Sequence, residues 1–162
     1  MRTSAVERSS EFRHRDDKQS PEQRLRWIAV VFLVAVTVHG ADHVRRGMDV
    51  VTTQVMWAGS IQYLLAVIAV VLVYRRHPWA PLAAIAIGFA SAIGFSAAHL
   101  LPHWSSFSDS FTGSRVAPNV NILSWTTAVF EIGADLAFGW AGVRVLQELR
   151  KTQPAASTAA AS

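Results

Sequence analysis

The chain of 162 residues is 51% hydrophobic and 16% charged, with a formal net charge of +4 and a mean hydropathy of +0.27. A soluble domain would carry about 25% charged residues, so this composition favours a membrane protein. The chain contains no cysteine, which excludes disulfides, thiolate metal sites, iron–sulfur clusters and cysteine nucleophiles.

Four apolar runs follow a polar N-terminal stretch. Residues 1–24 are polar, mixed in charge and without apolar periodicity, and they are expected to be a disordered or loosely helical cytoplasmic tail. Each run approaches the roughly 20 residues that a helix needs to cross a bilayer. The predicted transmembrane helices span about 25–44, 55–74, 78–101 and 121–146. The sequence therefore predicts an all-α integral membrane protein, a four-transmembrane-helix bundle over residues 25–146, with residues 147–162 as a second cytoplasmic tail.

Positive charges are distributed unevenly between the ends of these runs. If the helices alternate in direction, twelve of the 15 lysines and arginines fall on one side, and only Arg45, Arg46 and Arg115 fall on the other. Because segments rich in lysine and arginine remain in the cytoplasm, both termini are expected to be cytoplasmic. The protein is expected to lie in the inner (plasma) membrane. The pI of about 10.3 then reflects topology and not a nucleic-acid partner, so the expected partner is the lipid bilayer. The excess of arginine over lysine and the abundance of alanine indicate a bacterial chain.

Titratable residues gather in the outward halves of the predicted helices. His39, Asp42 and His43 end the first run, His99 ends the third, and His103 follows it closely. In an alternating bundle, the ends of the first and third helices lie at the same face as the starts of the second and fourth. Polar residues from separate parts of the chain therefore converge at the outer end, while the inner halves are almost entirely apolar.

Two acidic residues, Glu131 and Asp135, lie inside the fourth run. A charged side chain at the bilayer centre costs about 2.5–3.5 kcal/mol or more, so both must face the bundle and find partners there. Their four-residue spacing, like that of His39 and His43, puts them on one face of a helix. A rise of about 1.5 Å per residue places Glu131 at a depth that His39 can reach, and Asp135 about one turn deeper.

The residue types in this cluster favour a metal site, because zinc and iron bind imidazole nitrogen and carboxylate oxygen. The predicted ligands are His39, His43, His99 and Glu131. The residues expected to support and orient them are Asp42, His103 and Asp135. A metal-bound water becomes a nucleophile near neutral pH, which would suit a metal-dependent enzyme on a lipid-phase or interfacial substrate, with Glu131 and Asp135 as candidate catalytic groups. The sequence leaves open whether the chain is an enzyme. The pattern does not choose between zinc and iron.

Three other interpretations fit parts of the pattern. A b-type haem could be held between His39 or His43 and His99, although a haem pocket has no use for two carboxylates beside the ring. A proton-coupled carrier would use intramembrane acids and histidines, but its path would need polar groups in the inner halves. A non-catalytic bundle, such as a sensor or an assembly subunit, would use the polar cluster as structural glue.

Two further features concern packing around the cluster. Rows of small residues at four-residue spacing are expected to pack the third and fourth helices inside the bundle. These rows are Gly88, Ala92 and Ser96, and Gly133, Ala137 and Ala141. In the outer loop, 102–120, three aromatic residues are expected either to anchor at headgroup level or to cover the site, namely Trp104, Phe107 and Phe111.

Overall fold

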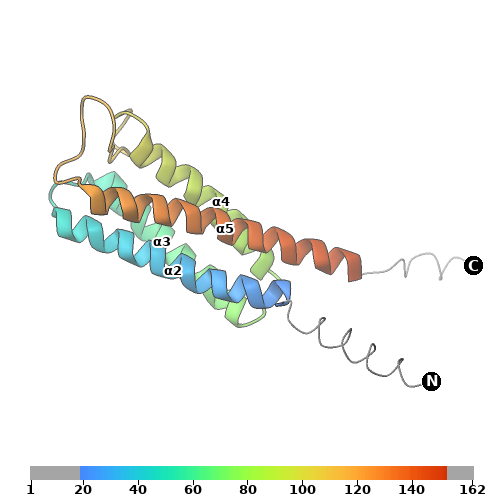
Figure 1. The fold of residues 1–162 in the computed structure, drawn as a ribbon. Helices are drawn as coiled ribbons and strands as arrows, with labels where there is room; N and C mark the ends of the chain where they lie inside the picture. The colour runs from blue at the N-terminus through green and yellow to red at the C-terminus, as the bar shows by residue number, and fades with distance from the viewer. Residues whose placement is uncertain (1–18, 153–162) are drawn as a thin grey trace, which may run out of the picture.

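The computed structural model describes residues 19–152, which form helices that run antiparallel to their chain neighbours (Figure 1). The helices are α2 (Pro21–Arg46), α3 (Thr53–Tyr74), α4 (Ala80–Phe95) and α5 (Ile122–Thr152), and α4 continues as a π-helical turn, η1 (Ser96–Leu100). The predicted all-α class is confirmed for the part of the chain that is described, which contains no strand. Residues 1–18 and 153–162, most of the two predicted tails, lie outside the described residues.

Local sequence signals extend α2 beyond its predicted limits. Ser20 caps the helix, since its side chain accepts a hydrogen bond from the Gln23 backbone N–H at 3.2 Å. Pro21 occupies the first helical position, where its missing N–H costs nothing. At the other end Gly47 adopts a φ of 107°, which favours glycine, and the helix stops at Arg46. The polar stretch before residue 25 is therefore partly helical.

The helices form a ring in which α5 is the most closely packed member. α5 contacts α4 and α2 extensively, whereas α3 contacts its neighbours α2 and α4 less. Phe32 of α2 stacks on Phe138 of α5 with ring centroids 4.5 Å apart, at the centre of a core of alanine, valine and leucine side chains. This apolar core fills the half of the bundle where α2 begins and α5 ends, which leaves the opposite half for polar side chains.

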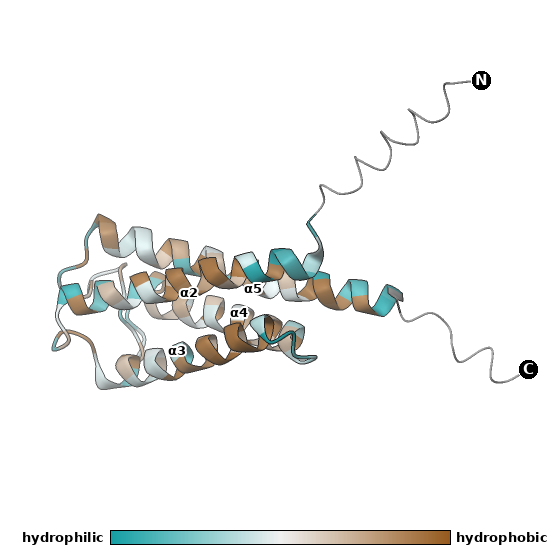
Figure 2. Ribbon diagram, turned by 90° about the horizontal axis from the view of Figure 1, so that it is seen from below, coloured by the Kyte–Doolittle hydropathy of each residue, from teal (hydrophilic) through white to brown (hydrophobic). Residues whose placement is uncertain are grey.

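Apolar residues make up much of the helices (Figure 2), and many of the large ones are exposed. Large exposed side chains include Val34, Ile61, Leu64, Ile68 and Ile93. A helix that is apolar on its outer as well as its inner face belongs in lipid or in a protein core. Three helices are long and apolar enough to cross a membrane, namely Pro21–Arg46, Thr53–Tyr74 and Ala80–Leu100.

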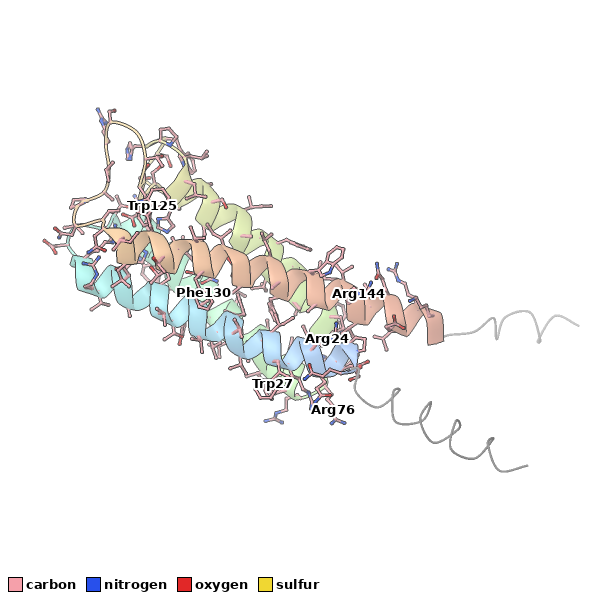
Figure 3. The ribbon with its side chains drawn as sticks, in the orientation of Figure 1. Arg24, Trp27, Arg76, Trp125, Phe130 and Arg144 are labelled. Carbon is pink, nitrogen blue, oxygen red and sulfur yellow. The ribbon has the colours of Figure 1, made fainter. Side chains whose placement is uncertain are left out.

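Basic residues from three separate segments lie at one end of the bundle. Arg24 of α2, Arg76 of the turn after α3, and Arg144 of α5 all lie at the end where α2 begins (Figure 3). Arg45 and Arg46 lie at the opposite end, where α2 stops. The alternating helices therefore separate the charges as the sequence pattern predicts.

Close contact between α4 and α5 depends on glycine. A Cβ added to Gly88 would lie 2.5 Å from the backbone nitrogen of Gly139 and 2.6 Å from the carbonyl oxygen of Asp135. A Cβ added to Gly142 would lie 2.6 Å from the carbonyl oxygen of Pro81. Because the facing atoms are backbone, the two helices could accommodate a side chain only by moving apart.

The predicted small-residue row is correct for the first of these helices and wrong for most of the second. Gly88 and Ala92 are buried in α4, but Gly133 and Ala137 of α5 are exposed. Gly139 and Gly142 make the close contacts instead. A helix carries several rows at four-residue spacing, so the spacing alone does not select the face that is buried.

We expect Gly88→Ala to destabilise the fold by about 1–3 kcal/mol, because the new methyl group would overlap the α5 backbone. Gly94→Ala is the matched control, since it lies on the same helix and its added Cβ meets no atom within 4 Å. Thermal unfolding in detergent would measure both. Equal transition temperatures for the two variants would contradict the close helix contact.

Candidate metal centre

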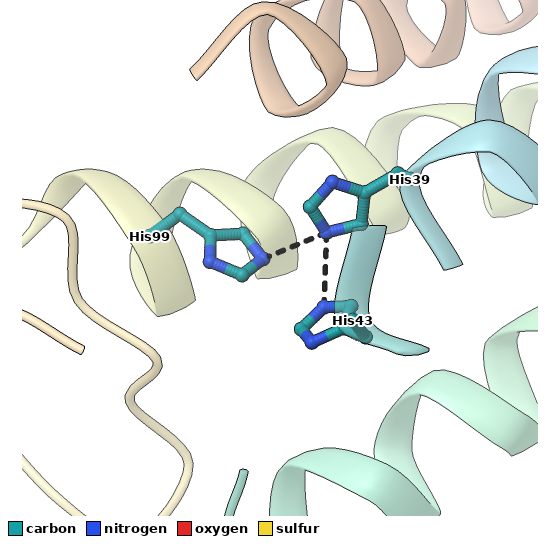
Figure 4. Close-up of side chains that lie close together, drawn as sticks. All are labelled: His39, His43 and His99. Carbon is teal, nitrogen blue, oxygen red and sulfur yellow. Dashed lines mark hydrogen bonds between the residues drawn. The ribbon is translucent and has the colours of Figure 1, made fainter. Parts of the chain in front are cut away.

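Three histidines converge at the polar end of the bundle. His39 and His43 project from the last turns of α2, and His99 projects from the π-helical turn η1 (Figure 4). The Nε2 atom of His39 lies 3.2 Å from Nε2 of His99 and 3.1 Å from Nε2 of His43. One nitrogen from each of the three rings lies within 4.8 Å of the others, so the group could hold a metal ion.

These separations match a single metal better than a haem. Nitrogens bound at about 2.0–2.1 Å to a tetrahedral zinc stand roughly 3.3 Å apart, close to the 3.2 and 3.1 Å that separate His39 Nε2 from the other two. The two axial nitrogens of a haem lie on opposite sides of the iron, roughly 4 Å apart, with the porphyrin ring between them. In this cluster the ring centroid of His99 lies 4.9 Å from that of His39 and 5.8 Å from that of His43, with the rings inclined at 69° and 43°, which leaves no room for a porphyrin between His99 and either of them.

The π-helical turn and the loop after it bring His99 into the cluster. π-helical turns are rare and are frequent at functional sites. The carbonyl groups of this helix end are satisfied by the loop: the Asp109 N–H donates to the Ala98 carbonyl at 3.0 Å, and the Phe111 N–H donates to the His99 carbonyl at 2.8 Å. Two side chains of the loop also donate hydrogen bonds to carbonyl groups of this helix end: Trp104 Nε1 donates to the Ala97 carbonyl, and Thr112 Oγ1 donates to the Leu100 carbonyl. The helix predicted as a continuous run to residue 101 is therefore an α-helix only to Phe95.

A backbone acceptor fixes the tautomer of His99, and a hydroxyl beside His39 allows the same tautomer there. His99 Nδ1 lies 2.9 Å from the Asp109 carbonyl oxygen, which can only accept, so Nδ1 carries the proton of the neutral ring. Thr127 Oγ1 donates to the Ser124 carbonyl at 3.1 Å and can therefore accept from His39 Nδ1 at 3.4 Å. Both neutral rings then present a bare Nε2 lone pair, and these two atoms face each other at 3.2 Å. Two lone pairs at this distance repel unless a cation lies beside both.

His43 differs from the other two histidines in its partners. Its Nδ1 lies 3.1 Å from Arg46 Nη2, which donates, and 3.7 Å from Asp109 Oδ2, which accepts. The ring can therefore carry its proton on either nitrogen. It offers a lone pair at Nε2 only when Nδ1–H faces Asp109. His43 is also the most accessible of the three, with 13% of its side chain exposed.

The structure places the two predicted acids of α5 behind His39. Glu131 Oε2 lies 3.8 Å from His39 Nδ1, on the opposite side of the ring from the nitrogen that faces His43 and His99. Asp135 lies one turn further along α5. Both carboxyl groups are fully buried, and neither has a hydrogen-bond partner within residues 19–152. Because buried charges are normally paired or bind metals, these groups need positive charge or protons nearby.

The other predicted supporting residues lie in different surroundings. Asp42 is buried and pairs with Arg45 Nε at 2.8 Å and with Arg46 Nε at 3.5 Å, so it contacts the basic residues beside it and none of the three imidazoles. His103 is exposed in the outer loop, outside the group of three histidines. Of the seven predicted residues, the cluster gathers His39, His43 and His99, with Glu131 directly behind.

Asp109 is the residue of this site that sequence reasoning missed. Its carbonyl orients His99, and its carboxylate pairs with Arg46 and approaches His43 and His99. Phe111 is buried beside it, with its ring centroid 4.6 Å from that of His99 and 5.4 Å from the Arg46 guanidinium carbon. The outer loop is thus part of the site. Asp109 stands among serines in an irregular segment, where no spacing rule predicts which residues turn inward.

No model of a protein family matches the chain, and no curated protein or solved structure does so either. Evidence about function therefore comes from the geometry of the three histidines and their surroundings.

Proposed function

We propose that this chain is a multi-pass membrane protein that binds one transition-metal ion through His39, His43 and His99. The observation that carries the proposal is the approach of the Nε2 atoms of His39 and His99 to 3.2 Å, with Nε2 of His43 3.1 Å from that of His39; the lone pairs of His39 and His99 face each other when both rings are protonated on Nδ1. A divalent cation bound to all three would remove the repulsion. It would also supply positive charge near the buried carboxyl group of Glu131. Glu131 enters the proposal as a buried acid beside His39, because its Oε2 lies 3.8 Å from Nδ1 of that ring.

The membrane topology is part of the same proposal. α5 would be the fourth spanning helix, since it is long enough and packs against α2 and α4, two helices that can cross a membrane. Its buried acids lower its apolar character but face the bundle and not the lipid. With the arginine-rich end of the bundle in the cytoplasm, both termini are cytoplasmic and the histidines lie at the outer face. The proposed location is the inner (plasma) membrane of a bacterium.

Three protein ligands leave a coordination position free for water or a substrate, which is the arrangement of catalytic zinc sites. A metal at this position polarises a bound oxygen and lowers the pKa of bound water, so a reaction on a lipid-phase or interfacial substrate is the chemistry it supports best. Imidazole nitrogens suit zinc and iron alike. A proton carrier is less well supported, because the core at the other half of the described bundle is apolar.

Metal analysis of the purified protein tests the proposal. Protein prepared in detergent without chelators is expected to contain about one zinc or iron ion per chain, and the apoprotein is expected to take up one Co²⁺ with visible d–d absorption. A folded protein that contains no metal and takes up no Co²⁺ would overturn it, and a shared proton between His39 and His99 would then explain their approach. A Soret absorption band in the same sample would show a bound haem and would overturn the proposal of a single metal ion.

A further inference from the structure

A cavity of about 830 Å³ lies beside the three histidines, between α2, α3 and α4. All three imidazoles and Glu131 line it at one end. Trp104 and Phe107 of the outer loop also line it. A volume of this size falls in the range of about 300–1,000 Å³ that is typical of small-molecule sites. The proposed metal would therefore face a pocket that is open on one side and large enough for a small molecule.

The rest of the cavity wall is apolar or already hydrogen-bonded. On the α3 side, Gln62 Nε2 donates to Ser91 Oγ of α4 at 3.2 Å, and Ser60 Oγ donates to the Met56 carbonyl at 2.8 Å. The remaining walls are mainly carbon atoms, from Val36, Ile61, Leu65 and Ile87 among others. The cavity thus has one polar pole, at the histidines, and an apolar remainder.

Glycines keep the cavity open on three helices. Gly40 of α2, Gly59 of α3 and Gly94 of α4 all line it, and a Cβ added to any of them would meet no atom within 4 Å. Gly88 of α4 must be glycine because the backbone of α5 lies against it. No backbone lies against the three glycines of the cavity, so close helix packing does not explain them. α3, which forms one wall, is also the least closely packed helix of the ring.

We propose that this cavity binds a single-chain lipid carboxylate, with its hydrocarbon chain between α2, α3 and α4 and its carboxylate on the metal. The inference rests on the proposed metal site. A divalent ion held by three neutral imidazoles carries net positive charge, which complements an anionic oxygen ligand. The apolar walls fit a hydrocarbon chain, since each buried methylene strengthens binding by about 0.8 kcal/mol, or roughly fourfold. Ile61 and Leu65 line the cavity and are 56% and 41% exposed, so the cavity is open beside α3, where a chain could enter from the bilayer.

Titration of the Co²⁺-loaded protein with acetate, hexanoate and dodecanoate tests this inference, using the visible spectrum as the readout. At a fixed detergent concentration, the half-saturating concentration is expected to fall by at least tenfold from acetate to dodecanoate. Gly94→Leu is expected to raise the value for dodecanoate at least tenfold and to leave that for acetate unchanged, because the added side chain fills the cavity. Gly133→Leu is the matched control, an exposed glycine of α5 outside the cavity, and is expected to behave as the unmodified chain.

The outcomes separate this inference from the proposal on which it rests. Failure to take up Co²⁺ would overturn the metal site, and the lipid ligand with it. A normal Co²⁺ spectrum with equal half-saturation for acetate and dodecanoate would overturn the lipid ligand alone. Unchanged dodecanoate binding by Gly94→Leu would also contradict it, because the chain would then lie somewhere else.

Discussion

His39→Ala and His99→Ala are each expected to lower the affinity for Zn²⁺ or Co²⁺ by more than the roughly 10–100-fold that a supporting hydrogen bond contributes. His99 has its Nδ1 proton held by a backbone carbonyl and His39 Nδ1 lies beside a hydroxyl that can accept, so both rings can direct an Nε2 lone pair at the cluster. His43→Ala is expected to cost less, because His43 must give up its contact with Arg46 before its Nε2 can bind a metal. Competition against a chromogenic chelator would measure all three affinities.

Two controls make this ranking decisive. His103→Ala removes an exposed histidine outside the cluster and is expected to leave the affinity unchanged. Glu131→Gln is expected to lower it by about 10–100-fold, since Glu131 acts through His39. A loss for Glu131→Gln as large as that for His99→Ala would instead make Glu131 a ligand. Equal small losses for every histidine, His103 included, would contradict a specific site.

The fold follows from the sequence because its strongest signals are long and local. Apolar runs of nearly 20 residues predict the helices, and their alternation predicts that the two ends of the bundle differ in charge. The depth argument also placed His39 and Glu131 correctly: residues 92 positions apart meet, with Nδ1 and Oε2 at 3.8 Å. A constant rise per residue makes such a comparison possible along two antiparallel helices.

The parts that could not be predicted depend on irregular backbone or on rotation about a helix axis. The π-helical turn at Ser96–Leu100 sets the direction of His99, and no residue pattern in that turn distinguishes it from an α-helix. Asp109 reaches the site through a loop, so its role depends on tertiary contacts. Gly139 of α5, and not Gly133, packs on α4, because the spacing of small residues does not fix which face is buried.

Charges buried beside the metal centre present a separate question, because they are costly unless they are paired. Arg46 is buried with 2% of its surface exposed, and it lies between Asp42 and Asp109. This group joins the end of α2 to the outer loop that orients His99. These three charged residues therefore hold the loop in place. Their contribution to the stability of the fold can be measured separately from metal binding.

Arg46→Met is expected to destabilise the protein by about 3–5 kcal/mol, because it leaves the buried carboxylate of Asp109 without a cation. Asp42 is affected less, since it keeps Arg45 at 2.8 Å. Adding Asp109→Asn to Arg46→Met is expected to restore part of the stability, because the unpaired charge is removed while the backbone carbonyl that holds His99 stays in place. Unfolding in mixed detergent micelles would compare the single and double variants.

Lys151→Met provides the control for this comparison. The substitution removes the ion pair between Lys151 and Glu148, in which the lysine side chain is 67% exposed. Such surface ion pairs contribute only about 0–1 kcal/mol to stability. If Arg46→Met were no more damaging than Lys151→Met, the buried charges would not hold the loop. If the double variant were less stable than Arg46→Met alone, Asp109 would stabilise the loop by contacts other than Arg46. Full recovery of stability in the double variant would assign the whole loss to the unpaired charge of Asp109. Arg46 would then serve the site by neutralising Asp109, the residue that orients His99.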